Sequence, residues 1–248
     1  MLYVLTNTFR YRENPALDVA VAIGNKLKKP VWIHGFIDDR EIKTKRRAAF
    51  ILDGFREFQS KCLSHSIRCT FSMSYNKNRK PHHLSLTHRA CVVVTDEAFV
   101  KPHLNTMNSI SKASPCLTIA VDTSCILPAQ HVNKSSISRA YKFRAATSEQ
   151  RKKRALIPYS NAPLPQHKFE TLCLEPFLDL SKFHNTQLLT RLEELSDVSV
   201  IRHTVGGEYV SFLRRDSKEA DDKSHSYTSN RTDQTQNCAG KSFSATAE

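Results

Sequence analysis

Five short apolar runs recur along the first half of the chain, and polar positions separate them. The clearest run, residues 90–94 (ACVVV), shows no polar alternation, which is typical of a strand covered on both faces of a parallel sheet. We therefore predict a central strand at this position. The same reasoning predicts four further strands, at residues 2–6, 31–37, 67–73 and 116–122.

The stretches between these runs carry apolar side chains at helical spacing. Asn14 and Pro15 form an N-cap followed by a proline at the first helical position, and a buried stripe follows from Leu17 to Leu27. A second helix is predicted around residues 48–62 and another at residues 99–110, whereas the polar stretch 74–88 is predicted to be a loop with a short helix. Five strands alternating with helices indicate an α/β fold, a doubly wound, five-stranded parallel Rossmann-like sheet.

The pattern changes after residue 122. Residues 138–156 form a strongly basic helical segment, and Pro158, Pro163, Pro165 and Pro176 then favour an extended linker or a segment that wraps the domain. A short helix is predicted at residues 186–195. The last stretch has almost no large apolar side chains, so we expect disorder there. The predicted division is an α/β domain at 1–135, a partly irregular extension at 136–215 and a disordered tail at 216–248.

Composition narrows the class of protein. The seven cysteines form no CxxC pair and mostly lie in apolar segments, which favours buried, reduced thiols in an intracellular protein. No signal peptide and no apolar run long enough for a membrane helix are evident, so we expect a soluble protein. The formal net charge is +13, and the excess of positive charge lies before residue 216, where it favours weak, nonspecific attraction to nucleic acid.

The residue inventory excludes several chemistries. With only six glycines, neither GxGxxG nor a GxxxxGK[ST] phosphate loop occurs, and there is no GxSxG elbow. His82, His83 and His88 lack the spacing of a metal site, so we interpret them as a solvated basic loop.

Polar groups follow three of the predicted strands, at the edge where open α/β sheets bind ligands. Arg10 follows the first strand, Asp38 and Asp39 follow the second, and Asp96 and Glu97 follow the central strand. If the first and central strands are neighbours, the crevice between their ends is the candidate site. The acidic pairs are suited to a metal ion or a ribose hydroxyl, or to capping the helices that follow.

Several of these stretches resemble one known family. The runs FRYRENPALDVAVAI, KKPVWIHGFIDDR and RRAAFILDGFREF resemble the amino-terminal antenna domain of the photolyase/cryptochrome superfamily. RACVVVTDEAF and AVDTSCILP resemble the fourth and fifth strands of class II and class II-like deoxyribodipyrimidine photolyases, and RAYKFR resembles the arginine-rich helix that leaves that domain. The resemblance covers about residues 1–157, and more weakly reaches residue 213.

The resemblance implies a fold and a ligand. In the family this domain holds an antenna chromophore, a deazaflavin or a folate, near the carboxyl ends of the first strands, and a following helical domain binds FAD and damaged DNA. The positions that match the chromophore site are Thr6, Arg10, Asp38, Asp96 and Glu97.

The departures from the family are large. Only a short, mostly polar stretch follows Gly206, the FAD-pocket motifs are absent, and Trp32 is the single tryptophan, so no tryptophan relay is possible. We therefore expect a truncated photolyase-like protein that lacks the FAD domain, does not bind FAD and is not catalytic alone. Its expected partners are a chromophore and a helical photolyase-domain chain.

Two other functions remain open. The first is a Rossmann-like nucleotide-binding regulator, which adenine nucleotides would stabilise. The second is a nucleic-acid accessory protein that binds through the basic cluster Arg151, Lys152, Lys153 and Arg154.

Overall fold

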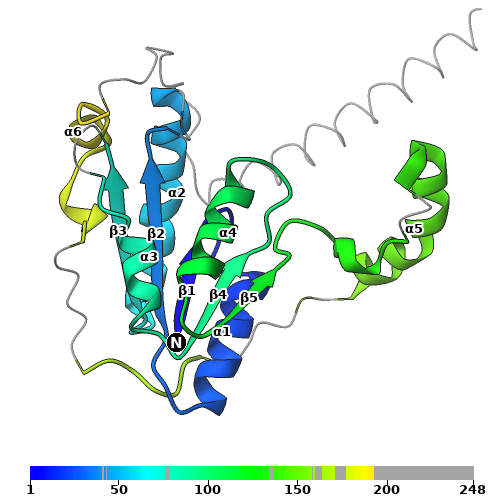
Figure 1. The fold of residues 1–248 in the computed structure, drawn as a ribbon, viewed down its shortest axis with the longest axis horizontal. Coiled ribbons are helices and arrows are strands. Elements are labelled where there is room, and N and C mark those ends of the chain that lie inside the picture. Colours follow the sequence, from blue (N-terminus) through cyan, green and yellow to red (C-terminus); the bar gives the residue numbers. More distant parts are fainter. Residues whose placement is uncertain are drawn as a thin grey trace, which may run out of the picture. The chain divides into compact units, whose positions relative to one another are not determined.

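A computed structural model describes residues 1–40, 42, 44–75, 79–133, 137–157, 159, 164–170 and 177–192. Its centre is a five-stranded sheet in which all paired strands run parallel, in the order β3-β2-β1-β4-β5 (Figure 1). The strands are β1 (Leu2–Leu5), β2 (Trp32–Asp38), β3 (Arg68–Ser74), β4 (Val92–Asp96) and β5 (Leu117–Val121). The predicted fold class is confirmed.

The first and central strands are neighbours, as the site prediction required. β1 pairs with β4 from Leu2↔Val93 to Val4↔Thr95, and β2 pairs with the other side of β1. The chain therefore reverses its direction of winding between β1 and β4, and this switch point is where open α/β sheets form a crevice.

Helices cover both faces of the sheet. Core residues on one face pack with α1 (Pro15–Lys26) and α2 (Lys45–Ser64), whereas those on the other face pack with α3 (His82–Thr87) and α4 (His103–Ala113) (Figure 1). Asn14 caps α1 as predicted, because its Oδ1 accepts a hydrogen bond of 3.1 Å from the backbone N–H of Leu17. The remaining helices are α5 (Ala140–Leu156) and α6 (Asn185–Leu189), with short 3₁₀ turns at Ala129–His131 and Leu180–Lys182.

The helix predicted from residue 99 begins four residues later, after Pro102, which disfavours helical backbone at the residue before it. Leu27, predicted to lie on the buried stripe of α1, is 44% exposed because α1 ends at Lys26.

A segment late in the chain packs against the sheet edge. The backbone N–H of Leu178 donates to the carbonyl of Phe71 in β3 at 2.8 Å, and Leu180, Leu188 and Leu192 are almost fully buried. We call residues 177–192 the edge strap. The tail predicted at 216–248 lies outside the described residues.

Two predictions about side-chain environment need correction. The loop histidines are not all solvated, because His83 stacks on Phe36 with 4.0 Å between ring centroids and His82 lies against Phe177. Among the five described cysteines, Cys62 and Cys69 are buried in the core, but Cys91, directly before β4, and Cys125, in the loop after β5, are exposed.

Candidate functional site at the carboxyl edge of the sheet

Asp96 closes the crevice between β1 and β4. Its carboxylate, in a residue only 1% exposed, accepts hydrogen bonds from the backbone N–H groups of Thr6, Asn7 and Thr8 at 2.9, 2.7 and 3.3 Å. The hydroxyl of Tyr3 donates to it at 2.8 Å, and burial together with this carboxylate raises the pKa of Tyr3. Asp96 therefore holds the loop after β1 in place.

Arg10 fastens the same loop to the end of β5. Its Nε donates to the carbonyl of Glu13 and its Nη2 to the carbonyl of Thr123, each at 2.8 Å. The hydroxyls of Thr8 and Thr123 also lie 2.6 Å apart. These contacts place Arg10 on the β5 side of the edge, away from Asp38.

Asp38 and Asp39 form an ion-pair network with Arg79, which the sequence analysis missed. Arg79 contacts Asp39 at 2.6 Å and Asp38 at 3.5 Å, and Arg40 pairs with Asp38. Burial acts to raise the pKa of Asp38, but hydrogen bonds and charge from Arg40, with Arg79, outweigh it and lower the pKa. The capping alternative is wrong for this pair, since Thr44 caps α2.

Glu97 lies beside Asp122 at the end of β5. Its Oε2 is buried with no hydrogen-bond partner among the described residues, and burial together with the charge of Asp122 raises its pKa. Neither Asp96 nor Glu97 caps α4, whose N-cap position is Pro102. Glu97 is separated from Asp38 by β1, which lies between β2 and β4.

A groove of about 430 Å³ opens at the carboxyl end of β2, and we call it the β2-end groove. The stacked rings of Phe36 and His83 form one wall, and burial lowers the pKa of His83 to about 4, so this ring is neutral near pH 7. Asp38 adds a carboxylate to the lining of the groove, and Arg40 adds a guanidinium group. The remaining lining comes from α3, α4 and the turns before them: Pro81, Leu84, Pro102, Asn105, Thr106 and Ser109.

A second cavity, of about 30 Å³, shares Phe36 and Asp38 with this groove and includes Thr6. Two of the five predicted positions, Thr6 and Asp38, therefore meet at the end of β2. Arg10 instead lines a separate pocket of about 420 Å³ with Asp122, Arg154 and Tyr159. The carboxyl edge thus divides into a β2 side and a β5 side.

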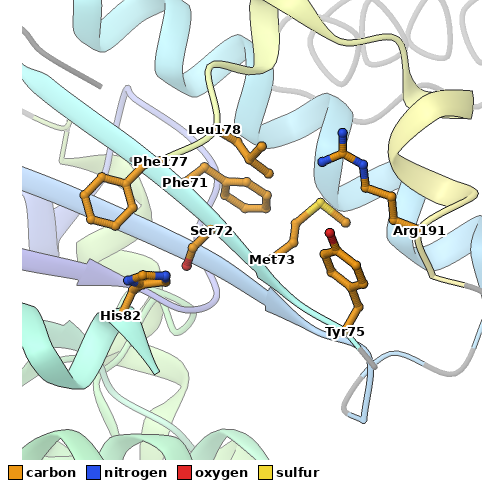
Figure 2. Close-up of a pocket in the computed structure, with 8 residues that line it drawn as sticks. All are labelled: Phe71, Ser72, Met73, Tyr75, His82, Phe177, Leu178 and Arg191. Carbon is orange, nitrogen blue, oxygen red and sulfur yellow. The ribbon is translucent and has the colours of Figure 1, made fainter. Parts of the chain in front are cut away.

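A smaller pocket of about 100 Å³ lies between β3 and the edge strap. Figure 2 shows Tyr75 and Arg191 at one end of it, with Phe177 and His82 at the other. Its volume is below that of most cofactor sites, which measure ~300–1,000 Å³.

The four basic residues proposed for nucleic acid lie on α5. Arg151 donates to the hydroxyl of Thr147 at 3.1 Å, Arg154 donates to the carbonyl of Ile126 at 2.7 Å, and Lys153 pairs with Glu149 at 2.7 Å. Lys152 is exposed. The cluster is therefore partly engaged within the protein.

Within the described ranges, no three or more histidine, cysteine or acidic side chains gather as metal ligands would. None of the described helices is both long and apolar enough to span a bilayer.

No protein-family model matches the sequence, and no curated protein matches it. Solved structures do match the fold. An archaeal photolyase from Sulfolobus tokodaii, described as holding two FAD molecules with an implied novel light-harvesting cofactor, matches with a TM-score of 0.54 at 9% identity, over 82% of this chain and 44% of its own. A cryptochrome from Synechocystis sp. PCC6803 matches with a TM-score of 0.58 at 12% identity, over 87% of this chain and 45% of its own.

A class III photolyase from Agrobacterium tumefaciens matches with a TM-score of 0.50 at 14% identity, over 73% of this chain and 37% of its own. The chain therefore has the α/β fold found in photolyases and cryptochromes, as the sequence resemblance implied. It spans less than half the length of each of these structures. The likeness to class II enzymes stays a prediction.

Proposed function

We propose that this chain is the antenna-type α/β module of a photolyase/cryptochrome-lineage protein, and that the β2-end groove holds a planar chromophore. The observation that carries the proposal is the groove itself. It has about 430 Å³ of volume, a neutral aromatic wall of Phe36 and His83, and the carboxylate of Asp38. This volume falls within the range of small-molecule sites, which is ~300–1,000 Å³.

Each side chain has a definite role in this proposal. The Phe36–His83 stack offers a flat apolar surface to an aromatic ring system. Asp38, held ionised by Arg40 and Arg79, accepts from a ring N–H or a hydroxyl. Asp96 and Arg10 act indirectly, because they hold the loop that contains Thr6. A deazaflavin or a folate has the ring and the polar substituents that such a groove would select.

In this proposal the chain binds the chromophore, and a separate helical chain or domain carries out catalysis. The fold matches less than half of each photolyase or cryptochrome chain, and FAD-dependent DNA chemistry is assigned to a helical partner chain or domain. The module alone is then non-catalytic. Light-dependent reversal of pyrimidine dimers by the purified chain alone would contradict this part of the proposal.

Titration of the purified chain with a deazaflavin and with a methenyl-folate, followed by chromophore absorbance and fluorescence, tests the site. We expect saturable binding of one of them, about tenfold weaker in Phe36→Ala, because the variant removes the aromatic wall. Ser111→Ala, an exposed position on α4 outside the groove, is the matched control. Equal affinity in Phe36→Ala, or binding of neither compound, would contradict the proposal.

The nucleotide-regulator alternative makes a different prediction at the carboxyl edge. Adenine nucleotides would raise the melting temperature and Phe36→Ala would abolish that rise, whereas the chromophores would have no effect.

A further inference from the structure

A second groove lies at the opposite end of the sheet from the β2-end groove. It has a volume of about 470 Å³ and is formed where the strands begin, by Leu2 of β1, Trp32 of β2, Arg68 of β3 and Cys91 before β4. We call it the amino-end groove. Its remaining walls come from Met1, Lys29, Pro30, Leu86, His88, Arg89, Ala90 and Phe169.

Two guanidinium groups lie against one indole ring in this groove. The Cζ of Arg68 is 4.9 Å from the centroid of Trp32 and 4.5 Å from that of Phe169. The Cζ of Arg89 is 5.6 Å from Trp32. The Nε1 of Trp32 donates to the hydroxyl of Thr70 at 2.8 Å, so the platform that positions both arginines is itself fixed. A guanidinium whose face is stacked on a ring directs its N–H groups outward in its own plane, the geometry that suits phosphate.

The charge of the groove has one sign. Three cationic side chains line it: Lys29 and Arg89, which are exposed, and Arg68. The imidazole of His88 lines it as well. None of the described residues that line the groove is aspartate or glutamate. Lys29 comes from the turn after α1 and Arg89 from the turn after α3, so the fold brings the charges together from separate segments. Focused positive charge of this kind attracts anions.

The groove also has an apolar wall, formed by Leu86, Ala90 and Phe169. Cations alone would suit any anion, but cations beside an apolar and aromatic wall suit an anion that carries a flat ring. We propose that the amino-end groove binds a nucleoside phosphate. Lys29 and Arg89 hold the phosphate, and the base lies against the apolar wall. The same chemistry is offered by a free nucleotide and by the phosphorylated end of a single nucleic-acid strand.

The chain provides its own reporter for this site. Trp32 is the single tryptophan of the sequence and lines the groove, so intrinsic tryptophan fluorescence reports on its occupancy. The full chain is titrated with ATP, with adenosine, with pyrophosphate, and with a short oligothymidylate with or without a 5′-phosphate.

We expect a saturable fluorescence change with ATP or with the phosphorylated oligonucleotide. The ligand with the higher affinity shows whether the groove prefers a free nucleotide or the phosphorylated end of a strand. Arg89→Gln should weaken that binding about tenfold, since a hydrogen bond to a charged group is lost. Lys29→Gln, on a different loop, should weaken it in the same direction and guards against a folding defect in the first variant. Lys101→Gln, at an exposed position before α4 that does not line the groove, removes the same charge and should leave the titration unchanged.

Three results would overturn the proposal. One is the absence of a saturable change with both phosphorylated ligands. Another is equal affinity in the Arg89→Gln, Lys29→Gln and Lys101→Gln variants. The third is pyrophosphate binding as tightly as ATP, which would show that the apolar wall contributes nothing. Phe36 lines the groove at the other end of the sheet and not this one, so ATP binding that persists in Phe36→Ala assigns the nucleotide to the amino-end groove, whereas its loss would assign the nucleotide to the β2-end groove.

Discussion

Asp96 shows how one buried carboxylate can organise the carboxyl edge of a sheet. Four donors from β1 and the loop after it, the N–H groups of Thr6, Asn7 and Thr8 and the hydroxyl of Tyr3, converge on it in a buried position. Buried donors that lose a charged acceptor cost more than an ordinary hydrogen bond. The position of the β1 loop, and hence of Thr6, depends on this one side chain.

We therefore expect Asp96→Asn to lower the free energy of unfolding by about 3 kcal/mol, because the amide supplies one acceptor and turns an N–H group toward existing donors. Urea unfolding followed by circular dichroism measures this. The neighbouring Glu97→Gln is the control and should be neutral or slightly stabilising, since it relieves repulsion from Asp122. Similar losses for both variants would refute the anchoring role.

The buried histidines make stability depend on pH. His34 is fully buried between the hydroxyls of Thr70 and Ser72, and burial lowers its pKa from 6.5 to about 3. Burial likewise lowers the pKa of His83 to about 4. Between these values and pH 6.5 the unfolded chain binds protons that the folded chain does not, so stability is greatest above pH 6.5 and falls as the pH is lowered.

The variant His83→Phe keeps an aromatic ring against Phe36 but cannot titrate. Its unfolding free energy should therefore depend less steeply on pH than that of the parent between pH 6.5 and about 4. The difference should approach ~1 kcal/mol per pH unit. Identical slopes in urea unfolding across this interval would show that His83 is already protonated in the folded protein.

At the scale of elements, close contact between β2 and α2 depends on a missing side chain. A Cβ built on Gly35 would lie 2.3 Å from Cε2 of Phe55, whose ring is fully buried. The ring of Phe55 also packs against Phe71 of β3, with 4.6 Å between centroids, so it has little room to move. Gly35 thus sets how closely α2 approaches the strand that carries Asp38.

Gly35→Ala should accordingly cost about 1–3 kcal/mol of stability, the usual range for overpacking a core. Gly35→Ala/Phe55→Leu, which makes room for the new methyl group, should be less destabilised than the sum of the two single variants. Thermal unfolding of all four proteins forms a double-mutant cycle. Additive losses would mean that the two positions do not meet.

The edge strap depends on two side chains of α2. Gln59 donates to the carbonyl of Cys69 at 3.0 Å and accepts from the N–H of Leu180 at 3.1 Å. Arg56 donates to the carbonyls of Leu180 and Phe183, each at 3.1 Å. These bonds satisfy a backbone carbonyl of the edge strand β3 and backbone groups of the strap.

Gln59→Leu retains much of the side-chain volume but removes both hydrogen bonds. We expect faster hydrogen exchange at residues 178–192, with α1 and β4 unchanged. Ser60→Ala, the exposed neighbouring position on α2, should leave the pattern of the parent protein. Equal protection of the strap in both variants would show that apolar contacts alone hold it.

At the scale of the whole molecule, the fold was predictable because β1 and the first part of β4 are continuous apolar runs, which are typical of strands that a parallel sheet buries on both faces. The site was less predictable. Thr6 and Asp38 line a common cavity, but Arg79, which pairs with Asp38, and His83, which stacks on Phe36, come from a polar stretch with no periodic signal. The roles of Asp96 and Gln59 depend on contacts far apart in sequence, which local pattern does not encode.

The net charge of +13 is also a property of the whole chain. It raises the question of whether nucleic acid binds through α5 or through the overall positive charge. Arg151 and Arg154 contact the protein itself, whereas Lys152 and Lys153 are exposed and the pair of Lys153 with Glu149 is a weak surface ion pair. Lys152→Gln/Lys153→Gln should then reduce the slope of log affinity for duplex DNA against log salt by about two, one for each released phosphate contact. Lys26→Gln/Lys28→Gln, two exposed lysines at the end of α1, removes the same charge elsewhere and should change the slope less. Equal changes for the two pairs would assign the binding to overall charge rather than to α5.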